Sequence, residues 1–295
     1  MAIVLFAVLI ALLVGHSLPD LARLRGYLWF EHWLGWCHRG GALFGGGRAA
    51  LILVLLLPLL PLIALQGLLI GHWFGLPSFL LATAFLLYTL GPRDLDQDVD
   101  AVALAVAGVD RSEALQRLPE EPPEPALPVR AEVLVDQVIL AALARWFGVL
   151  FWFVVAGATG ALAFRLLCFT VGEARFRQHL SSEQAEFARF LRAIAEWPAA
   201  QLMTLALALA ADFDAVASAW REFHNNHVAG WFSTRSGYLT AAARASVDLE
   251  AEAEAGDDAE HAAINAMQQT MSLVWRMLIV WLAALSLLVL AGKIG

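Results

Sequence analysis

Long apolar runs alternate with polar segments along the chain, and one of the longest runs without a charge lies between Arg145 and Arg165. Nineteen uncharged residues separate these two arginines. At about 1.5 Å rise per residue, such a helix covers roughly the 30 Å hydrocarbon thickness of a bilayer. The pattern predicts a central transmembrane helix over residues 138–169. Ala156 and Gly160, four apart, predict a face on which another helix packs closely.

Further apolar segments lie on either side of this helix. Residues 1–18 are expected to form a retained membrane helix, since they lack the basic start and small-residue cleavage site of a signal peptide. Residues 49–90 predict a transmembrane hairpin, whose first helix should be kinked at Pro58 and Pro61 because proline has no backbone N–H to donate. A last span is expected over residues 273–291.

The polar segments are also expected to be helical. Residues 93–137 carry eleven acids and four arginines, and apolar positions at helical spacing predict a helix over Leu95–Leu118. A proline-rich linker follows over residues 119–128. Residues 172–272 predict an amphipathic helical region. The apolar helix 197–211 within it is only fifteen residues long, a length that leaves open a core helix, a re-entrant segment and a short membrane span.

Two features bear on how the chain meets the membrane surface. Leu21–His38 mixes tryptophan and tyrosine with charged residues, as expected either of a helix lying in the interface or of an amphipathic helix packed on the protein. Arginines near the ends of the hairpin place residues 93–137 on the cytoplasmic side. The sidedness of residues 172–272 stays open, because Arg165–Arg192 also carries five arginines.

Composition then fixes the class of protein. Apolar residues make up 60% of the 295-residue chain, well above a typical soluble domain, so the sequence predicts an all-α, polytopic helical membrane protein. The net charge of −8, without a basic stripe, argues against nucleic acid as a partner. Walker A, dinucleotide-binding, GxSxG and HExxH motifs are absent. We therefore expect no cofactor, no metal and no catalytic residue.

Four segments, taken in order, carry a family resemblance: GPRDLDQDVDA, RWFGVLFWFVVAGATGALAFRLL, WPAAQLMTLALALAADFDA and the C-terminal hydrophobic anchor. Together they resemble the AmpE family, inner-membrane proteins of Gram-negative bacteria linked to β-lactamase induction. That family is similar in turn to the CobD/CbiB proteins, membrane enzymes that attach an aminopropanol arm to a corrinoid. The resemblance covers most of residues 1–295 and implies a multi-pass protein of the bacterial inner membrane.

The chain departs from the corrinoid enzymes where their chemistry is expected. The resemblance implies polar, acidic segments before and after the central span, but this chain reads AALARWFG at Ala141–Gly148 and CFTVGE at Cys168–Glu173. Arg93 and Asp94 remain from an RDL segment. The resemblance therefore implies a scaffold that has lost this active site, and the protein is expected to be regulatory rather than enzymatic.

Five charged residues form the candidate ligand site: Arg93, Asp94, Asp98, Arg145 and Arg165. Arginine matches phosphate bidentately, and Asp94 and Asp98 share a helical face. Simpler interpretations remain for each residue. Arg93 and Asp94 suit a membrane-end arginine and an aspartate helix cap. The pairs Asp94 with Asp98 and Asp96 with Asp100 suit a solvated face or a Mg²⁺ site, and Arg145 and Arg165 suit helix-end arginines that reach for the interface. If either arginine turns inward, Asp136 and Glu173 are the nearest candidate acids in the sequence.

Histidine offers one further candidate site. His224 and His227 are three apart and share a helical face, but zinc needs three or four ligands and the sequence shows no adjacent third. Metal binding there is the less favoured interpretation.

The sequence thus leaves two principal functions open. The first is a sensor of cell-wall state that acts on β-lactamase induction, with the lipid bilayer, a phosphate-bearing or cell-wall-derived small ligand, and a membrane or cytoplasmic protein as candidate partners. The second is a CobD/CbiB-like enzyme that forms an amide bond on a phosphate-bearing substrate. A transporter is less favoured, because few polar residues besides Gln66 and Thr83 lie within the spans.

Overall fold

The computed structural model describes most of the chain, and every regular element in it is a helix. The described residues are 2–17, 26–40, 47–69, 76–91, 93–106, 108–119, 127–226, 236–247, 249 and 258–292. Among these described residues, four helices are long and apolar enough to cross a membrane, by length and composition: Arg48–Leu69, Ala131–Gly172, Ser182–Ala210 and Ala259–Leu290. The prediction of an all-α, polytopic helical fold is confirmed.

The chain folds into two compact units. The first unit comprises Met1–Pro92, Gly148–Ala195 and Leu288–Gly295, and the second comprises Arg93–Phe147 and Glu196–Leu287. The polar segment that follows Pro92 therefore belongs to a different unit from the hairpin that precedes it.

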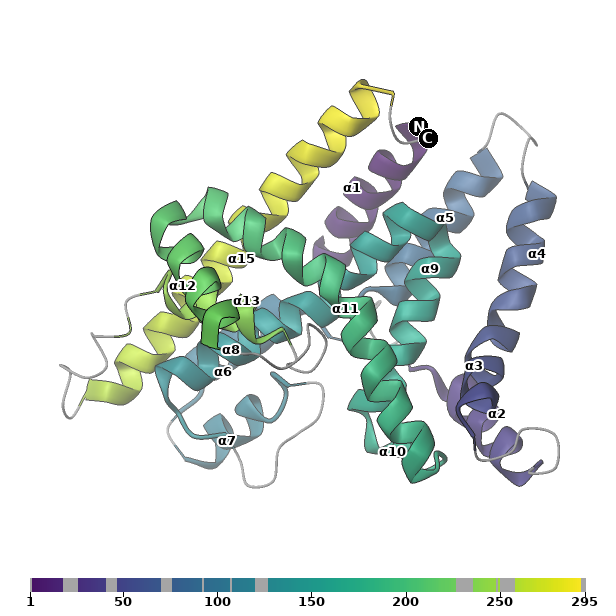
Figure 1. The fold of residues 1–295 in the computed structure, drawn as a ribbon, viewed down its shortest axis with the longest axis horizontal. Coiled ribbons are helices and arrows are strands. Elements are labelled where there is room, and N and C mark those ends of the chain that lie inside the picture. The colour runs from purple at the N-terminus through teal and green to yellow at the C-terminus, as the bar shows by residue number, and fades with distance from the viewer. Residues whose placement is uncertain are drawn as a thin grey trace. The chain divides into compact units, whose positions relative to one another are not determined.

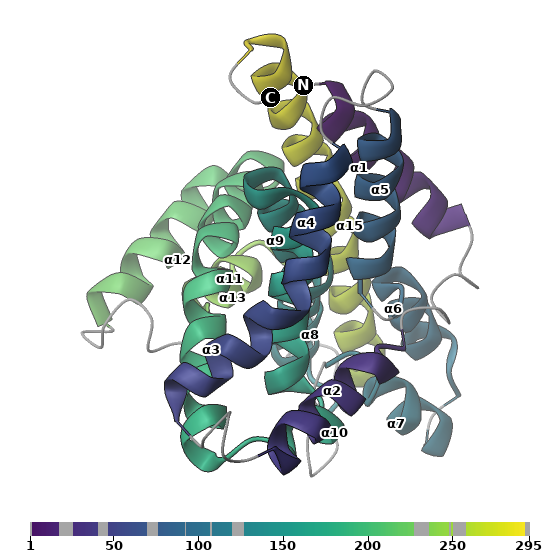
Figure 2. The ribbon, with the colours of Figure 1, turned by 90° about the vertical axis from the view of Figure 1, so that its right-hand side faces the viewer.

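In the first unit, helix α5 lies between α1 and α9 (Figure 2). The elements of this unit are α1 (Ala2–Ser17), α2 (Leu28–Arg39), α3 (Arg48–Leu56), η2 (Leu57–Leu59), α4 (Leu60–Leu69), α5 (Leu76–Thr89), α9 (Gly148–Gly172), α10 (Ala174–Arg177) and the start of α11 (Ser182–Ala210). Tyr27 packs on Tyr88 and on Phe169, with ring centroids 4.5 Å apart in both pairs. Aromatic packing thus joins the segment before α2 to α5 and α9.

Proline disrupts the first helix of the hairpin as predicted. Between α3 and α4 the chain forms the 3-10 turn η2, which contains Pro58, and Pro61 follows within the first turn of α4. Proline cannot donate the backbone hydrogen bond that would continue the α-helical ladder. The predicted interruption is therefore confirmed.

Helix α9 contains a break that the sequence pattern did not predict. Ala156 (φ −132°, ψ 17°) and Gly157 (φ +66°, ψ −157°) both leave helical geometry. Gly157 occupies a region that side-chain-bearing residues rarely adopt. Gly160, from the predicted small-residue face, is also constrained within the helix, because a Cβ there would lie 2.4 Å from the carbonyl oxygen of Trp152.

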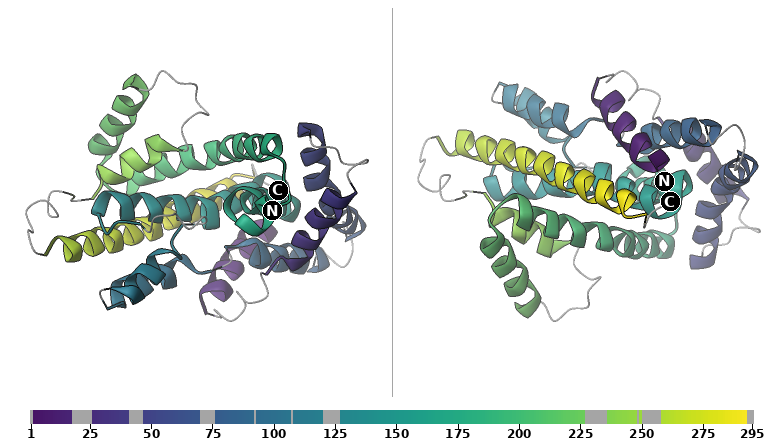
Figure 3. Two further views of the ribbon diagram at one scale, coloured as in Figure 1. Left: turned by 90° about the horizontal axis from the view of Figure 1, so that it is seen from below. Right: turned by 90° about the horizontal axis from the view of Figure 1, so that it is seen from above.

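The second unit contains the polar segment and most of the long C-terminal helix. Its elements are α6 (Leu95–Leu104), α7 (Val109–Leu115), α8 (Ala131–Ala142), the π-helical turn η4 (Leu143–Phe147), the end of α11, α12 (Phe213–Asn226), α13 (Gly237–Arg244) and most of α15 (Ala259–Leu290). Figure 1 shows α12 and α13 beside each other. Figure 3 shows α15 running alongside α8, seen from above and from below.

Ion pairs and aromatic rings join these helices. Asp136 on α8 accepts two hydrogen bonds from the guanidinium of Arg244 on α13. Arg111 on α7 pairs with Glu260 on α15. Trp146 and Phe147 of η4 meet Trp275 and Trp281 of α15 edge to face, with ring centroids 5.1 Å apart in both pairs. Thus α13 is joined to α8, α7 is joined to α15, and the π-helical turn after α8 packs on α15.

Two predicted helices differ from those in the structure. The single helix expected over Leu95–Leu118 is two, because the backbone is extended at Ala105 and Gly108 has a φ of +103°. Conversely, the apolar run 197–211 is not a separate helix, since α11 continues through Pro198 to Ala210. The charged segment before Trp197 and the apolar segment after it therefore share one helix.

Candidate functional site

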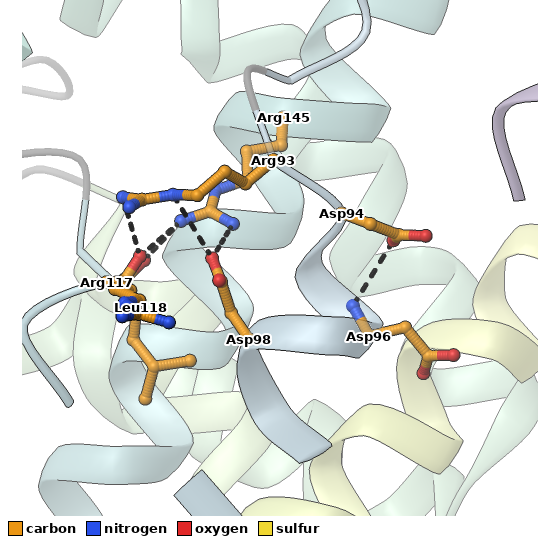
Figure 4. Close-up of polar contacts among 7 residues, drawn as sticks. All are labelled: Arg93, Asp94, Asp96, Asp98, Arg117, Leu118 and Arg145. Carbon is orange, nitrogen blue, oxygen red and sulfur yellow. Dashed lines mark hydrogen bonds and ion pairs between the residues drawn. The ribbon is translucent and has the colours of Figure 1, made fainter. Parts of the chain in front are cut away.

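A buried ion pair between Arg145 and Asp98 forms the centre of the candidate site (Figure 4). Nη1 of Arg145 donates to Oδ2 of Asp98 at 2.6 Å. The two residues are 1% and 5% exposed, respectively. Because water is largely excluded, removing Asp98 would take the paired carboxylate away from a buried guanidinium.

Local sequence explains how Asp98 reaches this position. Asp94 precedes the first residue of α6, and its carboxylate accepts a hydrogen bond from the backbone N–H of Asp96 at 3.3 Å. An aspartate at this place satisfies a backbone donor that the helix leaves open. Asp98 lies one turn further, on the same side as the buried Leu95 and Val102, and α6 packs against α8.

Arg145 also binds the turn that follows α7. Its Nη2 donates to the carbonyl oxygens of Arg117 at 2.7 Å and Leu118 at 2.8 Å. Both residues lie beyond Leu115, the last residue of α7, so these carbonyl groups belong to a turn and not to the helix. One guanidinium therefore bridges the carboxylate of α6 and the turn after α7.

Arg93 occupies the solvent-accessible side of the same cluster. Its Nε lies 3.8 Å from Oδ2 of Asp98, and its Nη2 donates to the carbonyl oxygen of Arg117 at 3.4 Å. The side chain is 51% exposed. Asp98 is thus paired with two guanidinium groups, and Arg93 is the one that an anion from solution can reach.

The structure brings together three of the five residues proposed from the sequence, Arg93, Asp98 and Arg145. Asp94 caps α6 beside them. Arg165 belongs to the first unit, where its Nε donates to the carbonyl oxygen of Thr89 at 2.7 Å. Its side chain also lies over the ring of Phe169, 5.7 Å from the centroid.

Neither Arg145 nor Arg165 reaches for the interface, since both are buried. The interpretation of these residues as exposed helix-end arginines is therefore wrong. Of the two acids considered as their partners, Asp136 pairs with Arg244 and Glu173 pairs with Arg175 at 2.6 Å.

Backbone carbonyls are the part of the site that sequence reasoning missed. Arg117 and Leu118 contribute main-chain oxygens, which no side-chain motif reveals. The sequence predicts a helix that ends at Leu118, directly before Pro119, whereas α7 ends at Leu115. The carbonyl groups of Arg117 and Leu118 therefore lie in a turn, which helical periodicity does not indicate.

Candidate metal ligands do not converge in the part of the chain that the structure describes. No group of three or more His, Cys, Asp or Glu side chains there is arranged to hold a metal ion. Asp96, which was considered for Mg²⁺, accepts a hydrogen bond from Nε1 of Trp275 at 3.2 Å. His224 donates through Nδ1 to the carbonyl oxygen of Trp220, and His227 lies outside the described residues.

Comparison with protein-family models, with curated proteins and with solved structures finds no match for this chain. The function is therefore argued from the residues and their geometry, together with the resemblance drawn from the sequence.

Proposed function

We propose that this chain is a regulatory protein of the bacterial inner membrane, of the AmpE type, that signals cell-wall state to β-lactamase induction. In this proposal the second unit receives a small ligand or a protein partner, and the membrane helices hold that unit at the bilayer. The order of the four resembling segments supports the proposal, as does the loss of the polar segments expected of the corrinoid enzymes.

The observation that carries the proposal is the use of Arg145 and Asp98. A catalytic acid or base must reach its substrate, but these two residues face each other at 2.6 Å and are almost fully buried. Nη2 of Arg145 donates to carbonyl oxygens in the turn after α7. The cluster fastens α6 and α7 to the apolar helix that contains Arg145, and this is a structural rather than a catalytic use of charged groups.

Arg93 is the residue proposed to meet a ligand. Its exposed guanidinium beside the buried pair suits a phosphate or carboxylate group, which arginine binds through two parallel hydrogen bonds. A phosphate-bearing or cell-wall-derived ligand that engages Arg93 would compete with Asp98 for the same guanidinium. Ligand binding would thereby change the contacts of α6.

Deletion and complementation test the proposal. Deleting the gene should alter basal or β-lactam-induced β-lactamase levels, and a plasmid copy should restore them. Arg93→Ala should fail to restore them although it accumulates in the membrane, as judged by immunoblot. Arg130→Ala, which removes another exposed arginine from the same polar segment, is the matched control and should complement fully. Unchanged β-lactamase levels in the deletion strain would refute the proposed role.

A second candidate, a CobD/CbiB-like enzyme, is favoured by one observation, the exposed Arg93 held 3.8 Å from Asp98. An arginine that is open to solution beside a buried carboxylate suits a phosphate-bearing substrate. Purified protein with ATP, Mg²⁺ and candidate amines should then release ADP or phosphate, at a rate that Arg93→Ala lowers. Folded protein without turnover would eliminate this candidate.

A further inference from the structure

The second unit contains a mainly apolar pocket that the proposed function does not use. Its volume is about 360 Å³, within the range of roughly 300–1,000 Å³ in which proteins hold small molecules. One wall belongs to α11, which contributes Gln201, Thr204, Leu205 and Ala208. These positions recur at helical spacing, so they share one face of the helix.

The other wall belongs to α12, which begins at Phe213, shortly after α11 ends at Ala210. Asp212 caps this helix, since its carboxylate accepts hydrogen bonds from the backbone N–H groups of Asp214 at 2.9 Å and Ala215 at 3.2 Å. The side chains of α12 that line the pocket also follow helical spacing, and they are Phe213, Val216, Ala217, Trp220 and Arg221. The pocket therefore lies between two helix faces that a short turn joins.

The protein leaves part of this pocket uncovered. Leu205 and Phe213 line it and are 55% and 57% exposed, respectively. An apolar occupant would cover these side chains, and the removal of apolar surface from water favours binding. The pocket therefore suits a ligand with an apolar body.

Polar groups gather at one end of the pocket. Among its lining residues, Gln201 and Arg221 lie farthest along the chain from the turn at 211–212, whereas Ala208 and Phe213 lie nearest to it. Because the two helices meet at that turn, the polar pair marks the end away from it. The pocket thus offers a polar end and an apolar end, which together suit an amphiphile.

Arg221 presents an open guanidinium at the polar end. Its Nε donates to the carbonyl oxygen of Ala217 at 3.1 Å, and no carboxylate among the described residues pairs with it. By contrast, Arg244 of the same unit pairs with Asp136. The two Nη groups of Arg221 therefore remain for an anion, which a guanidinium binds through two parallel hydrogen bonds.

Two exposed acids of α12 bear on the charge of the ligand. Asp214 lies seven residues before Arg221, two helical turns or roughly 10 Å along the axis, which is close to the Debye length at physiological salt. Glu222 follows Arg221 directly, and consecutive residues of a helix do not face each other. One guanidinium in this setting suits a singly charged carboxylate better than a doubly charged phosphate.

Volume limits the size of the ligand. At about 30 Å³ for each heavy atom, the share of a water molecule in its liquid, a pocket of 360 Å³ holds on the order of twelve heavy atoms. Decanoate has that size, whereas a phospholipid with two acyl chains is several times larger. The pocket therefore suits a single chain of medium length.

We propose that this pocket binds a medium-chain fatty acid, with its carboxylate at Arg221 and its chain along Leu205 toward Phe213. The guanidinium that lines the pocket selects an anion, the apolar walls select a hydrocarbon body, and the volume selects a single chain. This site is separate from the cluster around Asp98, and its existence does not depend on the proposed regulatory role.

Photo-crosslinking of the full-length protein in phosphatidylcholine nanodiscs tests the proposal. The probe is decanoic acid with a diazirine at the end of its chain, and peptide mass spectrometry locates the label. Because the carboxylate is held at Arg221, label should concentrate near the turn, on Ala208 and Phe213. Label spread evenly over the apolar helices would mean that the probe samples only the bilayer, and it would overturn the proposal.

Two tryptophan substitutions provide a matched pair. Ala217→Trp fills the pocket, whereas Ser218→Trp places the same side chain at the next position of α12, which is exposed and outside the pocket. Labelling of Ala208 and Phe213 should fall severalfold in the first variant and stay unchanged in the second. Equal labelling of the two variants would overturn the assignment of the ligand to this pocket.

Arg221→Gln tests the charge. The substitution should raise the probe concentration for half-maximal labelling about fivefold, the upper end for an exposed ion pair. Arg276→Gln removes an exposed arginine of α15 that does not line the pocket, and it should leave that concentration unchanged. Equal concentrations for the two variants would overturn the role given to Arg221.

Competition on the unsubstituted protein keeps the test independent of how the variants fold. At matched concentrations in the bilayer, unlabelled decanoate should displace the probe from Phe213, and decanol should not. Equal displacement by decanol would overturn the preference for an anion. Displacement by decyl phosphate at a lower concentration than by decanoate would overturn the choice of a carboxylate.

Discussion

Arg145 and Asp98 lie 47 positions apart in the chain, yet Nη1 of Arg145 donates to Oδ2 of Asp98 at 2.6 Å. The pair joins the π-helical turn after α8 to the middle of α6. Desolvation of two charges costs free energy that their attraction only partly offsets. Together with the bonds from Arg145 to the carbonyls of Arg117 and Leu118, the pair therefore holds α6 and the turn after α7 in one arrangement, and the buried guanidinium depends on the carboxylate being present.

Removing the carboxylate should destabilise the second unit strongly. Asp98→Ala leaves Arg145 buried without its counter-charge, and loss of one partner from a buried pair costs about 3–5 kcal/mol. The free energy of unfolding, measured in mild detergent by denaturant titration, should fall by that amount. Asp100→Ala, an exposed aspartate half a turn away on α6, should change it by less than about 0.5 kcal/mol. Similar effects of the two substitutions would contradict this account of the pair.

Replacement of Arg145 by lysine should lower the stability of the protein. The guanidinium bonds one carboxylate and two carbonyl oxygens, and a single ammonium group lacks the planar fork that reaches all three. Arg145→Lys should therefore leave at least one buried acceptor unsatisfied, which costs about 1–3 kcal/mol.

Arg93→Lys provides the contrast to that substitution. Arg93 is half exposed and 3.8 Å from Asp98, and exposed ion pairs contribute between about 0 and 1 kcal/mol. Its replacement by lysine should leave thermal unfolding in detergent almost unchanged while impairing complementation.

The same thermal unfolding experiment tests Arg145→Lys. If this variant unfolds at the same temperature as the parent protein, the three acceptors do not depend on the guanidinium.

Much of the fold could be predicted from local pattern, and the contacts of the site could not. The spacing of Leu95, Val99 and Val102 identified the buried face of α6, because helical periodicity depends only on neighbours in the chain. Val106, the next position on that face, is 73% exposed, since the chain leaves the helix at Ala105. That change rests on the backbone of Gly108, which a count of apolar positions does not include.

Partner choice depends on tertiary packing. Asp136 and Glu173 are nearer to Arg145 or Arg165 in the sequence than Asp98 is, but they pair with Arg244 and Arg175. Charge and spacing indicated that Arg145 needs an anion if buried. They could not select one among eleven acids in residues 93–137, because that selection follows from how α6 packs on α8.

Gly157 should tolerate no side chain, for reasons of backbone conformation. Its φ of +66° with ψ of −157° suits only glycine, although the position where a Cβ would lie is open except for Gln66 Nε2 at 3.6 Å. Gly157→Ala should lower stability by about 1–3 kcal/mol.

Gly67→Ala is the natural control for this substitution. Gly67 lies within helix α4 and a Cβ there meets nothing within 4 Å, so alanine should leave stability unchanged or raise it by up to about 1 kcal/mol. Thermal unfolding of the two variants in the same detergent compares them. Equal midpoints would mean that α9 straightens at little cost.

The thiol of Cys37 should resist alkylation in the folded protein. Cys37 is buried on α2, and burial raises the pKa of its thiol. A raised pKa leaves less thiolate at any pH near neutrality, and the thiolate is the reacting form. Maleimide at pH 7, followed by peptide mass spectrometry, should modify Cys37 at least about tenfold more slowly than a cysteine placed at the exposed Gln178. Equal rates would show that α2 does not cover this thiol.

The break in α9 also changes the electrostatics of the central apolar segment. An unbroken helix carries a partial charge of about half an elementary unit at each end, where water or headgroups screen it. Ala156 and Gly157 leave helical geometry and divide α9 into two helical parts. The C-terminal end of the first part, with its partial negative charge, therefore meets the N-terminal end of the second part, with its partial positive charge, inside the apolar run. The amide of Gln66, whose Oε1 accepts a hydrogen bond from Thr159 at 2.6 Å, lies beside this pair of opposed dipole ends. A segment that is uncharged in its side chains therefore holds an internal electric dipole made by its backbone.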